Sequence, residues 1–433
     1  MGMKIRVPFR NSTLAANAGW MLAGQGVSVI AQAAYFIVIA RVLGSAEYGV
    51  FVGAAAMVAV LGMFSSLGSG MLIVRYVSPD HEMFPEYWGN GILSVMLAGS
   101  LCVALVGLLG PRLLHTQAGG MLIMIAAGDC VFAKLTDCAG RAFQAFEQLR
   151  ITATFTALTG VLRMIAAFLM WITLHHATAH QWADAYLGVS FVVAVFASLS
   201  CFARLGMPRF RPRLLIARFW EGIGFSFAGS TTSVYDDADK AMLTHYGQYA
   251  ASGAYSAAYK ILDVATLPIR SLHVAAFPRF FKSGMEGPSS TLIMACRILK
   301  RSFPYALGAA LAMFALAPIL PMLVGKGFID SVSVLRWLCL LPAIRSLHLS
   351  AGDAITGAGY QRFRTSTQFI AAGLNFCLNL YLIPAYSWHG AAWSTLITDG
   401  LLAVGNWGVL FWLQRGRCSL ASAGSVSSCV SEI

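Results

Sequence analysis

The sequence contains few charged residues for its length. Of its 433 residues, 58% are hydrophobic and only 11% are charged, and the mean hydropathy is +0.70. Soluble domains carry about 25% charged residues, so this composition excludes an ordinary soluble protein and predicts an integral membrane protein. The apolar run from Ala15 is long enough to span a bilayer and has no clear cleavage site, so we expect a retained first helix.

The sequence also lacks the motifs of metal sites and of enzymes. Its nine cysteines are scattered, with no CxxC pair and no Cys/His cluster, and we interpret them as small apolar side chains. His175, His176 and His180 share one loop, but no Cys or acidic cluster accompanies them. No hydrolase constellation and no phosphate-binding glycine motif is present. We therefore predict a protein that is not an enzyme and holds no metal or other cofactor.

Long polar segments are equally scarce. A helix that crosses a bilayer needs about 20 apolar residues. Twelve runs meet this length, with ends uncertain by several residues: 15–40, 48–74, 88–110, 119–142, 151–174, 183–204, 221–246, 253–278, 301–324, 331–357, 365–385 and 389–413. The connections between them leave no room for a soluble domain. The sequence thus predicts an all-α polytopic membrane protein with about twelve transmembrane helices.

Basic residues are distributed unequally over the two predicted sides of the membrane. Twenty of the 30 Lys and Arg residues fall on one side, and only Arg41, Arg112 and Lys326 fall on the other. Because Lys and Arg are retained in cytoplasmic loops, we predict that both termini are cytoplasmic. The net charge of +12 is then explained by membrane orientation, and we expect no nucleic-acid partner.

A faint repeat divides the chain into two halves. The sequences Gly49-Val50-Phe51 and Gly253-Ala254-Tyr255 are 204 residues apart, as are Arg75 and Arg279. Two six-helix halves of equal orientation imply a pseudo-twofold axis along the membrane normal and a polar central cavity between them. We predict a cytoplasmic N-terminus (1–14), two halves (15–204 and 221–413), a basic cytoplasmic linker (205–220) and a disordered cytoplasmic tail (414–433).

Fifteen charged residues interrupt the apolar runs. They are Asp129, Lys134, Asp137, Arg163, Asp236, Asp237, Asp239, Lys240, Lys260, Asp263, Arg270, Arg336, Arg345, Asp353 and Asp399. A charge at the centre of a lipid-facing helix costs roughly 2.5–3.5 kcal/mol, so fifteen would cost on the order of 40 kcal/mol. These residues must therefore face one another or a wet interior.

Six of the basic residues are candidate anion contacts in such a cavity: Arg163, Arg345, Lys134, Lys260, Arg270 and Lys240. Three lysines have an acid one helical turn away, in the pairs Lys240 with Asp236, Lys134 with Asp137, and Lys260 with Asp263. Arg163 and Arg345 have none. We expect at least one of these two arginines to contact an anion.

Four acids are candidates for ion coupling: Asp236, Asp237, Asp239 and Asp263. Consecutive helical positions point about 100° apart, so one salt bridge cannot satisfy the first three of them. Coupling to protons or sodium is one interpretation, and a structural network of charges is the other.

Two motifs resemble those of a known transporter family. Residues 40–49 (ARVLGSAEYG) look like its A-R-x-L-G-x-x-x-Y-G joint between the first two helices. Residues 239–243 (DKAML) and 253–260 (GAYSAAYK) resemble its signature in helices seven and eight. The family is the polysaccharide transporter (Wzx-type O-antigen flippase) branch of the multidrug/oligosaccharidyl-lipid/polysaccharide (MOP) exporter superfamily.

The resemblance implies a function and its partners. The substrate would be an undecaprenyl-diphosphate-linked oligosaccharide that moves from the cytoplasmic to the periplasmic leaflet of the bacterial inner membrane, by alternating access. The product would serve O-antigen (lipopolysaccharide), capsule or exopolysaccharide synthesis, with membrane lipids, a polymerase and chain-length proteins as partners. Basic cavity residues would offset the desolvation of the diphosphate.

Two alternatives remain open at this stage. A cation-coupled multidrug exporter of the same superfamily would hold a cationic substrate, and the acids of residues 236–239 favour it locally. A membrane-embedded polysaccharide polymerase or ligase would generally need a large outward loop with catalytic groups, and the outward connections are short.

Overall fold

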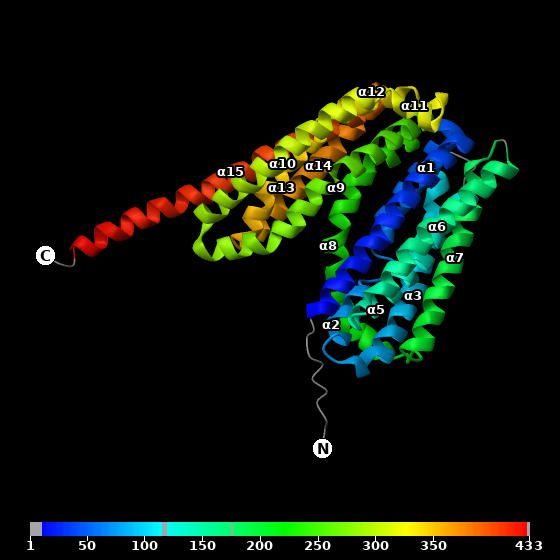
Figure 1. Cartoon of the computed structure of the whole chain (residues 1–433), viewed down its shortest axis with the longest axis horizontal. Helices are drawn as coiled ribbons and strands as arrows, with labels where there is room; N and C mark the ends of the chain where they lie inside the picture. Colours follow the sequence, from blue (N-terminus) through cyan, green and yellow to red (C-terminus); the bar gives the residue numbers. More distant parts are fainter. Residues whose placement is uncertain (1–10, 115–118, 175, 431–433) are drawn as a thin grey trace, which may run out of the picture. The chain divides into compact units, whose positions relative to one another are not determined.

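The computed structural model describes residues 11–114, 119–174 and 176–430, and within these ranges it is helical without strands (Figure 1). The first part comprises α1 (Asn11–Gly62), α2 (Ser69–Val77), η1 (His81–Met83), α3 (Phe84–Leu114), α4 (Gly119–Ala126), η2 (Ala127–Phe132), α5 (Ala133–Ala145), α6 (Leu149–Thr173) and α7 (Ala179–Arg204). The second comprises α8 (Pro212–His245), α9 (Tyr249–Glu286), α10 (Pro288–Leu316), α11 (Ile319–Val324), η3 (Lys326–Phe328), α12 (Asp330–Leu338), α13 (Leu341–Gly357), α14 (Gln361–Tyr386) and α15 (Trp388–Val430).

Two compact units, Met1–Asp237 and Ala238–Ile433, make up the chain. The boundary lies inside α8, and the first turns of that helix pack within the N-terminal unit. Arg75 of α2 forms an ion pair with Glu221 of α8 at 2.7 Å, and the hydroxyl of Tyr76 donates to the same carboxylate at 2.9 Å. The basic segment between α7 and α8 therefore leads into a helix whose start is held by the N-terminal unit.

The all-α class and the membrane-spanning character predicted from the sequence are confirmed for the described residues. Seven helical segments there are long and apolar enough to cross a membrane. The arrangement of twelve helices in two related halves stays a prediction. Helix α15 continues to Val430, into the tail for which the sequence predicts disorder.

The helices break at several points inside predicted spans. Helix α1 covers the first predicted span and much of the second, and its kink at Gly44, where φ is 72°, lies in the predicted connection between them. The predicted span 48–74 is wrong as a continuous helix, because the chain turns between α1 and α2. There Leu67 and Gly68 have positive φ, and a Cβ on Gly68 would lie 2.3 Å from the carbonyl oxygen of Gly222. The turn between α1 and α2 therefore lies in close contact with α8, where a side chain at position 68 would not fit.

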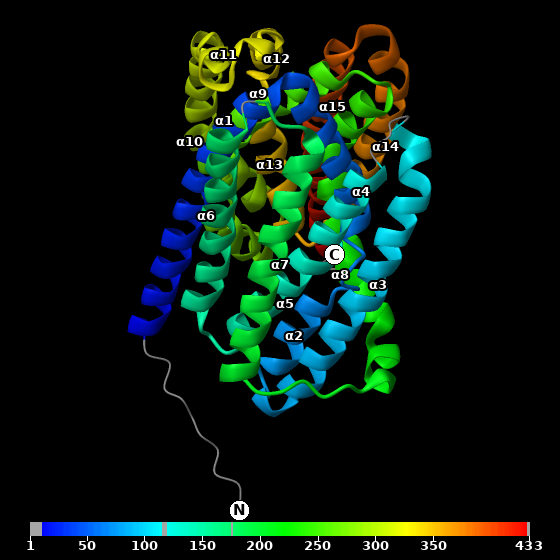
Figure 2. The same ribbon diagram turned by 90° about the vertical axis from the view of Figure 1, so that its right-hand side faces the viewer.

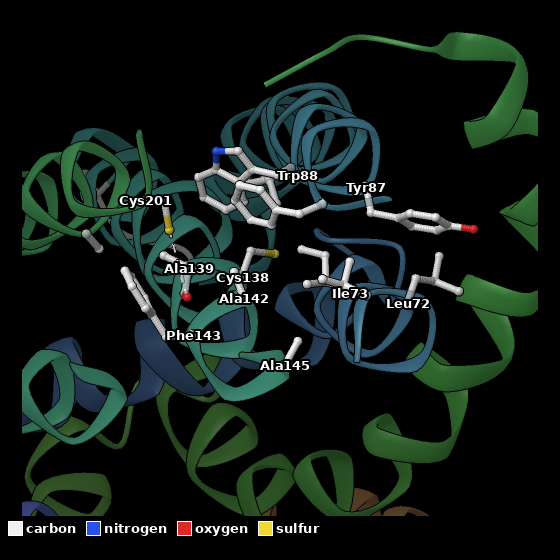
Figure 3. Close-up of a cluster of buried hydrophobic side chains, with 14 of the residues drawn as sticks. Leu72, Ile73, Tyr87, Trp88, Cys138, Ala139, Ala142, Phe143, Ala145 and Cys201 are labelled. Atoms are coloured by element: carbon white, nitrogen blue, oxygen red, sulfur yellow. Dashed lines mark hydrogen bonds between the residues drawn. The ribbon is translucent and has the colours of Figure 1, made fainter. Parts of the chain in front are cut away.

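The core of the N-terminal unit lies among α2, α3, α5 and α7 (Figure 3). Trp88 of α3 is fully buried, beside Ile73 of α2, Cys138 and Phe143 of α5, and Cys201 of α7. Helix α1 runs along α6 in both views of the molecule (Figures 1 and 2). This packing leaves one side of α5 and α6 free to face α1.

The core of the C-terminal unit is made by α9, α10, α13 and α15, where Phe280, Ile298, Ile355 and Leu410 are buried. Small residues let α9 and α13 approach closely. A Cβ on Gly284 would lie only 1.8 Å from the carbonyl oxygen of Gly357. The two backbones are therefore in direct contact, as small residues allow between membrane helices.

Candidate functional site

A polar cavity of about 510 Å³ lies inside the N-terminal unit, between α1, α5 and α6. Its wall consists of Ser28, Gln32, Ala133, Thr136, Asp137, Gly140, Arg141, Gln144, Thr152, Phe155, Thr156, Thr159, Gly160 and Arg163. Small-molecule sites typically have volumes of about 300–1,000 Å³. The cavity is thus large enough to hold a ligand within one half of the protein.

Helical periodicity places the polar residues of the wall on shared faces. On α6 they are Thr152, Thr156, Thr159 and Arg163, at intervals of four, three and four residues. Positions three and four apart lie on one side of a helix. From Thr152 to Arg163 the wall extends about 16 Å, at 1.5 Å per residue. The sequence reasoning missed this stripe of threonines, although its spacing beside an intramembrane arginine is a readable signal.

The threonine hydroxyls of the wall all donate to main-chain carbonyl oxygens. Thr152 donates across to Gly140 of α5 at 2.9 Å. The other three donate to the carbonyl four residues earlier, over 3.1 Å (Thr136), 3.3 Å (Thr156) and 2.9 Å (Thr159). A carbonyl oxygen can only accept, so the hydroxyl proton is used. Each of these hydroxyls then offers a ligand only its lone pairs.

Three charged side chains line the cavity, and two of them pair. Arg141 lies 3.5 Å from Asp137, and its Nη1 donates to Oε1 of Gln144 at 3.2 Å. Across the wall, the guanidinium of Arg163 lies 4.0 Å from the centre of the Tyr186 ring of α7. One positive charge is therefore not balanced within the wall itself.

Behind Arg163, Tyr186 links the cavity to a carboxylate. Its hydroxyl donates to Asp129 at 2.5 Å. Asp129 belongs to η2, a π-helical segment between α4 and α5. π-Helical segments are rare in proteins, and many of those that do occur lie at functional sites. The sequence reasoning recognised Asp129 as an intramembrane charge but did not connect it to Arg163, because the link runs through a tyrosine on another helix.

Arg163 and Lys134 are both predicted anion contacts, but only Arg163 lines the cavity. Arg163 lies in the cavity wall, whereas Lys134 of α5 does not. The expected partner of Lys134, Asp137, forms its ion pair with Arg141 instead. Arg141 is not among the fifteen intramembrane charges noted in the sequence, so its place in the wall was missed.

Arg345 occupies a different kind of environment in the C-terminal unit. It is 5% exposed and pairs with Asp399 of α15, with Nε 3.4 Å from Oδ2. Its guanidinium also lies 5.8 Å from the ring centre of Tyr259. The sequence reasoning found no acid one helical turn from Arg345, and its partner comes from another helix. The absence of a nearby acid in sequence was therefore misleading here, and Arg345 is a residue of a buried ion pair.

The remaining predicted basic residues also lie in the C-terminal unit. The Nζ of Lys240 lies 4.8 Å from the ring centre of Tyr259. Arg270 pairs with Asp263 at 3.9 Å, and both side chains are nearly half exposed. Lys260, which was expected to pair with Asp263, is exposed. These residues belong to the unit Ala238–Ile433, whereas the cavity of α1, α5 and α6 belongs to the unit Met1–Asp237.

Among the coupling candidates whose side chains the structure describes, Asp239 is the most buried, with 2% exposure. It accepts a hydrogen bond from the Tyr255 hydroxyl at 2.6 Å, and that hydroxyl lies 3.3 Å from Oγ1 of Thr395. Asp237 is partly buried. The side chain of Asp236, and its expected pairing with Lys240, lie outside the described residues.

A second buried network was not predicted. His273 of α9 contacts Asp353 of α13 through Nδ1 at 2.8 Å, and Arg364 of α14 donates to the other carboxylate oxygen at 3.0 Å. Only Asp353 among them was noted as an intramembrane charge. In the described part of the chain, no group of three His, Cys, Asp or Glu residues could hold a metal ion.

Comparison with known proteins gives a sequence family and a fold. The family model described as "Polysaccharide biosynthesis protein" matches residues 14–283. No curated protein sequence matches the chain.

Several solved structures are similar over nearly the whole chain. An inward-facing multidrug resistance MATE family transporter of the MOP superfamily has a TM-score of 0.67 and 14% identity, covering 98% of this chain and 97% of its own. The lipid II flippase MurJ, in an inward closed conformation, has a TM-score of 0.68 and 13% identity, covering 89% and 86%. A MOP superfamily transporter from Pyrococcus furiosus, described as having a binding pocket of reverse polarity, has a TM-score of 0.60 and 13% identity, covering 93% and 96%. At such identities these likenesses show the fold.

Proposed function

Because the chain belongs to the polysaccharide biosynthesis protein family, we propose that it is a flippase for an undecaprenyl-diphosphate-linked oligosaccharide. The resemblance read from residues 40–49, 239–243 and 253–260 is thereby confirmed at the level of the family and of the MOP fold. The observation that carries the proposal is this family match in a chain whose membrane-spanning N-terminal unit encloses a polar cavity. MurJ, which shares the fold, is named as a lipid II flippase.

The physical task of such a flippase is to carry a polar head group through an apolar layer. Polar groups that leave water without hydrogen-bond partners lose several kcal/mol each. A cavity lined by hydroxyl, amide and charged side chains supplies partners, while the lipid tail stays in the bilayer. In the predicted orientation, the α6 wall extends from the cytoplasmic end at Thr152 to mid-membrane at Arg163. The substrate would enter from the side on which it is made.

The membrane potential favours outward movement of an anionic substrate. The cell interior is negative, so each negative charge that moves outward gains about 2.3 kcal/mol per 100 mV. We include coupling to protons or sodium in the proposal, with Asp239 as its best placed acid, because that carboxylate is buried beside Tyr255. Asp236, Asp237 and Asp263 remain candidates beside it.

The balance of charge in the cavity argues against the multidrug-exporter alternative. A cationic drug would favour acids in the binding wall, but Asp137 is paired with Arg141 and the unbalanced charge is the cation of Arg163. The described P. furiosus transporter indicates that pocket polarity differs between members of this superfamily.

The proposal is tested by depleting the protein in its native cells. We expect lipid-linked oligosaccharide to accumulate in the cytoplasmic leaflet while surface polysaccharide falls, and expression of the wild-type chain should restore both. Unchanged surface polysaccharide in a strain without a second flippase, and no accumulated intermediate, would refute it.

A further inference from the structure

We propose that the cavity between α1, α5 and α6 is a subsite for the glycan of the substrate and not for its diphosphate. The ligand would be a short, hydroxyl-rich oligosaccharide, neutral or with a single acidic group. This inference rests on the proposed function, because it assigns one part of the lipid-linked oligosaccharide to one half of the protein. It differs from the expectation, drawn from the sequence, that basic cavity residues offset the desolvation of the diphosphate.

The direction of the hydrogen bonds in the wall carries the argument. Four threonine hydroxyls of the wall each donate a hydrogen bond to a carbonyl oxygen: those of Thr136, Thr152, Thr156 and Thr159. While they do so, they have only their lone pairs to offer a ligand. A fully ionised diphosphate has acceptor oxygens and no proton to donate, so it could hydrogen-bond to these hydroxyls only if they turned away from their carbonyl partners. A sugar hydroxyl donates and accepts, and it can donate to each of them.

The other polar side chains of the wall supply the complementary donors. Arg141 and Arg163 carry guanidinium N–H groups, and Gln32 and Gln144 carry amides. The Nε2 of Gln32 donates to the Ser28 hydroxyl at 3.0 Å, which leaves its amide oxygen as a further acceptor. The wall thus offers both donors and acceptors to a ligand. A polyol, whose hydroxyl groups do both, matches this wall better than an ion that only accepts.

The net charge of the wall also favours a glycan over a diphosphate. Asp137 and Arg141 form an ion pair, so Arg163 provides a net charge of one. Asp129, held behind the wall by Tyr186, offsets part of that charge. Two phosphate groups would bring at least two negative charges into the cavity, which is more than the net positive charge of one that its wall provides. One carboxylate on a sugar is the most that Arg163 can balance.

Binding to the full chain in lipid nanodiscs tests the subsite. The probes are the oligosaccharide released by mild acid from the host cell's own lipid-linked intermediates, and inorganic pyrophosphate. In titration calorimetry the oligosaccharide should bind, and pyrophosphate should not displace it. Thr156→Val keeps the shape of the side chain but removes the acceptor, so it should weaken oligosaccharide binding about tenfold.

Two further variants on α6 serve as controls. Thr156→Ser keeps the hydroxyl and should recover most of the affinity that Thr156→Val loses. Thr154→Val removes an exposed hydroxyl that also donates to a carbonyl four residues earlier, at 2.9 Å, but does not line the cavity. It should leave binding unchanged. Equal affinities of Thr156→Val and Thr154→Val, or displacement of the oligosaccharide by pyrophosphate, would overturn the subsite.

Transport measured on the same protein separates the two proposals. Flipping of lipid-linked oligosaccharide without binding of the released oligosaccharide would overturn the subsite and leave the flippase intact. Binding that depends on Thr156 without any flipping would overturn the proposed function and leave the saccharide site standing.

Discussion

At the scale of single residues, the surroundings of an intramembrane charge decide its role. Arg163 lies in a cavity wall with its guanidinium 4.0 Å from the Tyr186 ring centre, whereas Arg345 is 5% exposed and paired with Asp399. The sequence treats these two arginines alike, since neither has an acid one turn away. Their difference comes from partners on other helices, 54 residues distant in the case of Asp399. Local spacing therefore identifies the charges but not their partners.

We predict that Arg163 is needed for transport and that Tyr186 positions it. Arg163→Gln should reduce the initial rate of flipping at least tenfold. Tyr186→Phe keeps the cation–π contact, worth roughly 0.5–2 kcal/mol, and should retain most of the rate, whereas Tyr186→Leu removes it and should retain less. Rates in proteoliposomes, with thermal melting as the control for folding, check this. Equal rates for Tyr186→Phe and Tyr186→Leu would contradict the positioning role.

We predict that the Arg345–Asp399 pair stabilises the C-terminal unit. Removing one member of a buried pair leaves an uncompensated charge and costs about 3–5 kcal/mol, so Asp399→Asn should lower the free energy of unfolding strongly. The half-exposed Arg270–Asp263 pair is the matched control, and Asp263→Asn should cost at most about 1 kcal/mol. The check is denaturant unfolding in detergent micelles. Similar losses for both variants would show that burial does not govern these pairs.

At the scale of helices, hydropathy predicts where membrane segments occur but not where they break. The predicted spans 88–110, 151–174 and 183–204 correspond to α3, α6 and α7. In contrast, the turn between α1 and α2 has positive φ at Leu67 and Gly68 because α8 approaches it closely at Gly222. That contact joins residues over 150 positions apart, so no local sequence pattern predicts it. The threonine stripe of α6 was predictable from spacing alone.

We predict that the contact between α9 and α13 requires glycine. A Cβ on Gly357 would lie 2.5 Å from the carbonyl oxygen of Phe280. Gly357→Ala should therefore destabilise the protein by about 1–3 kcal/mol, as overpacking usually does. Gly373→Ala on α14 is the control, because nothing lies within 4 Å of its Cβ position, and alanine favours helix by up to about 1 kcal/mol. Thermal melting should show a drop for the first and no drop for the second.

At the scale of the whole molecule, a low content of charge is combined with a few polar networks inside the helical units. The family and the MOP fold were predicted from two short motifs and the hydropathy pattern. The site was only partly predicted from the sequence. Arg163 was among the candidates, but Arg141 and the three threonines of α6 were not. Hydroxyl direction and ion pairing depend on how α1, α5 and α6 pack. These details are what distinguish a saccharide site from a phosphate site.

The central claim is that the chain flips a lipid-linked oligosaccharide by means of the cavity in its N-terminal unit. The most direct measurement is the reconstitution of the purified chain in proteoliposomes with a fluorescent lipid-linked oligosaccharide from the native host. The account predicts rapid transfer between leaflets for the wild type and for Thr154→Val, and slow transfer for Arg163→Gln and Thr156→Val. Transfer at the rate of protein-free vesicles with the wild-type chain, or equal rates for all four proteins, would contradict it.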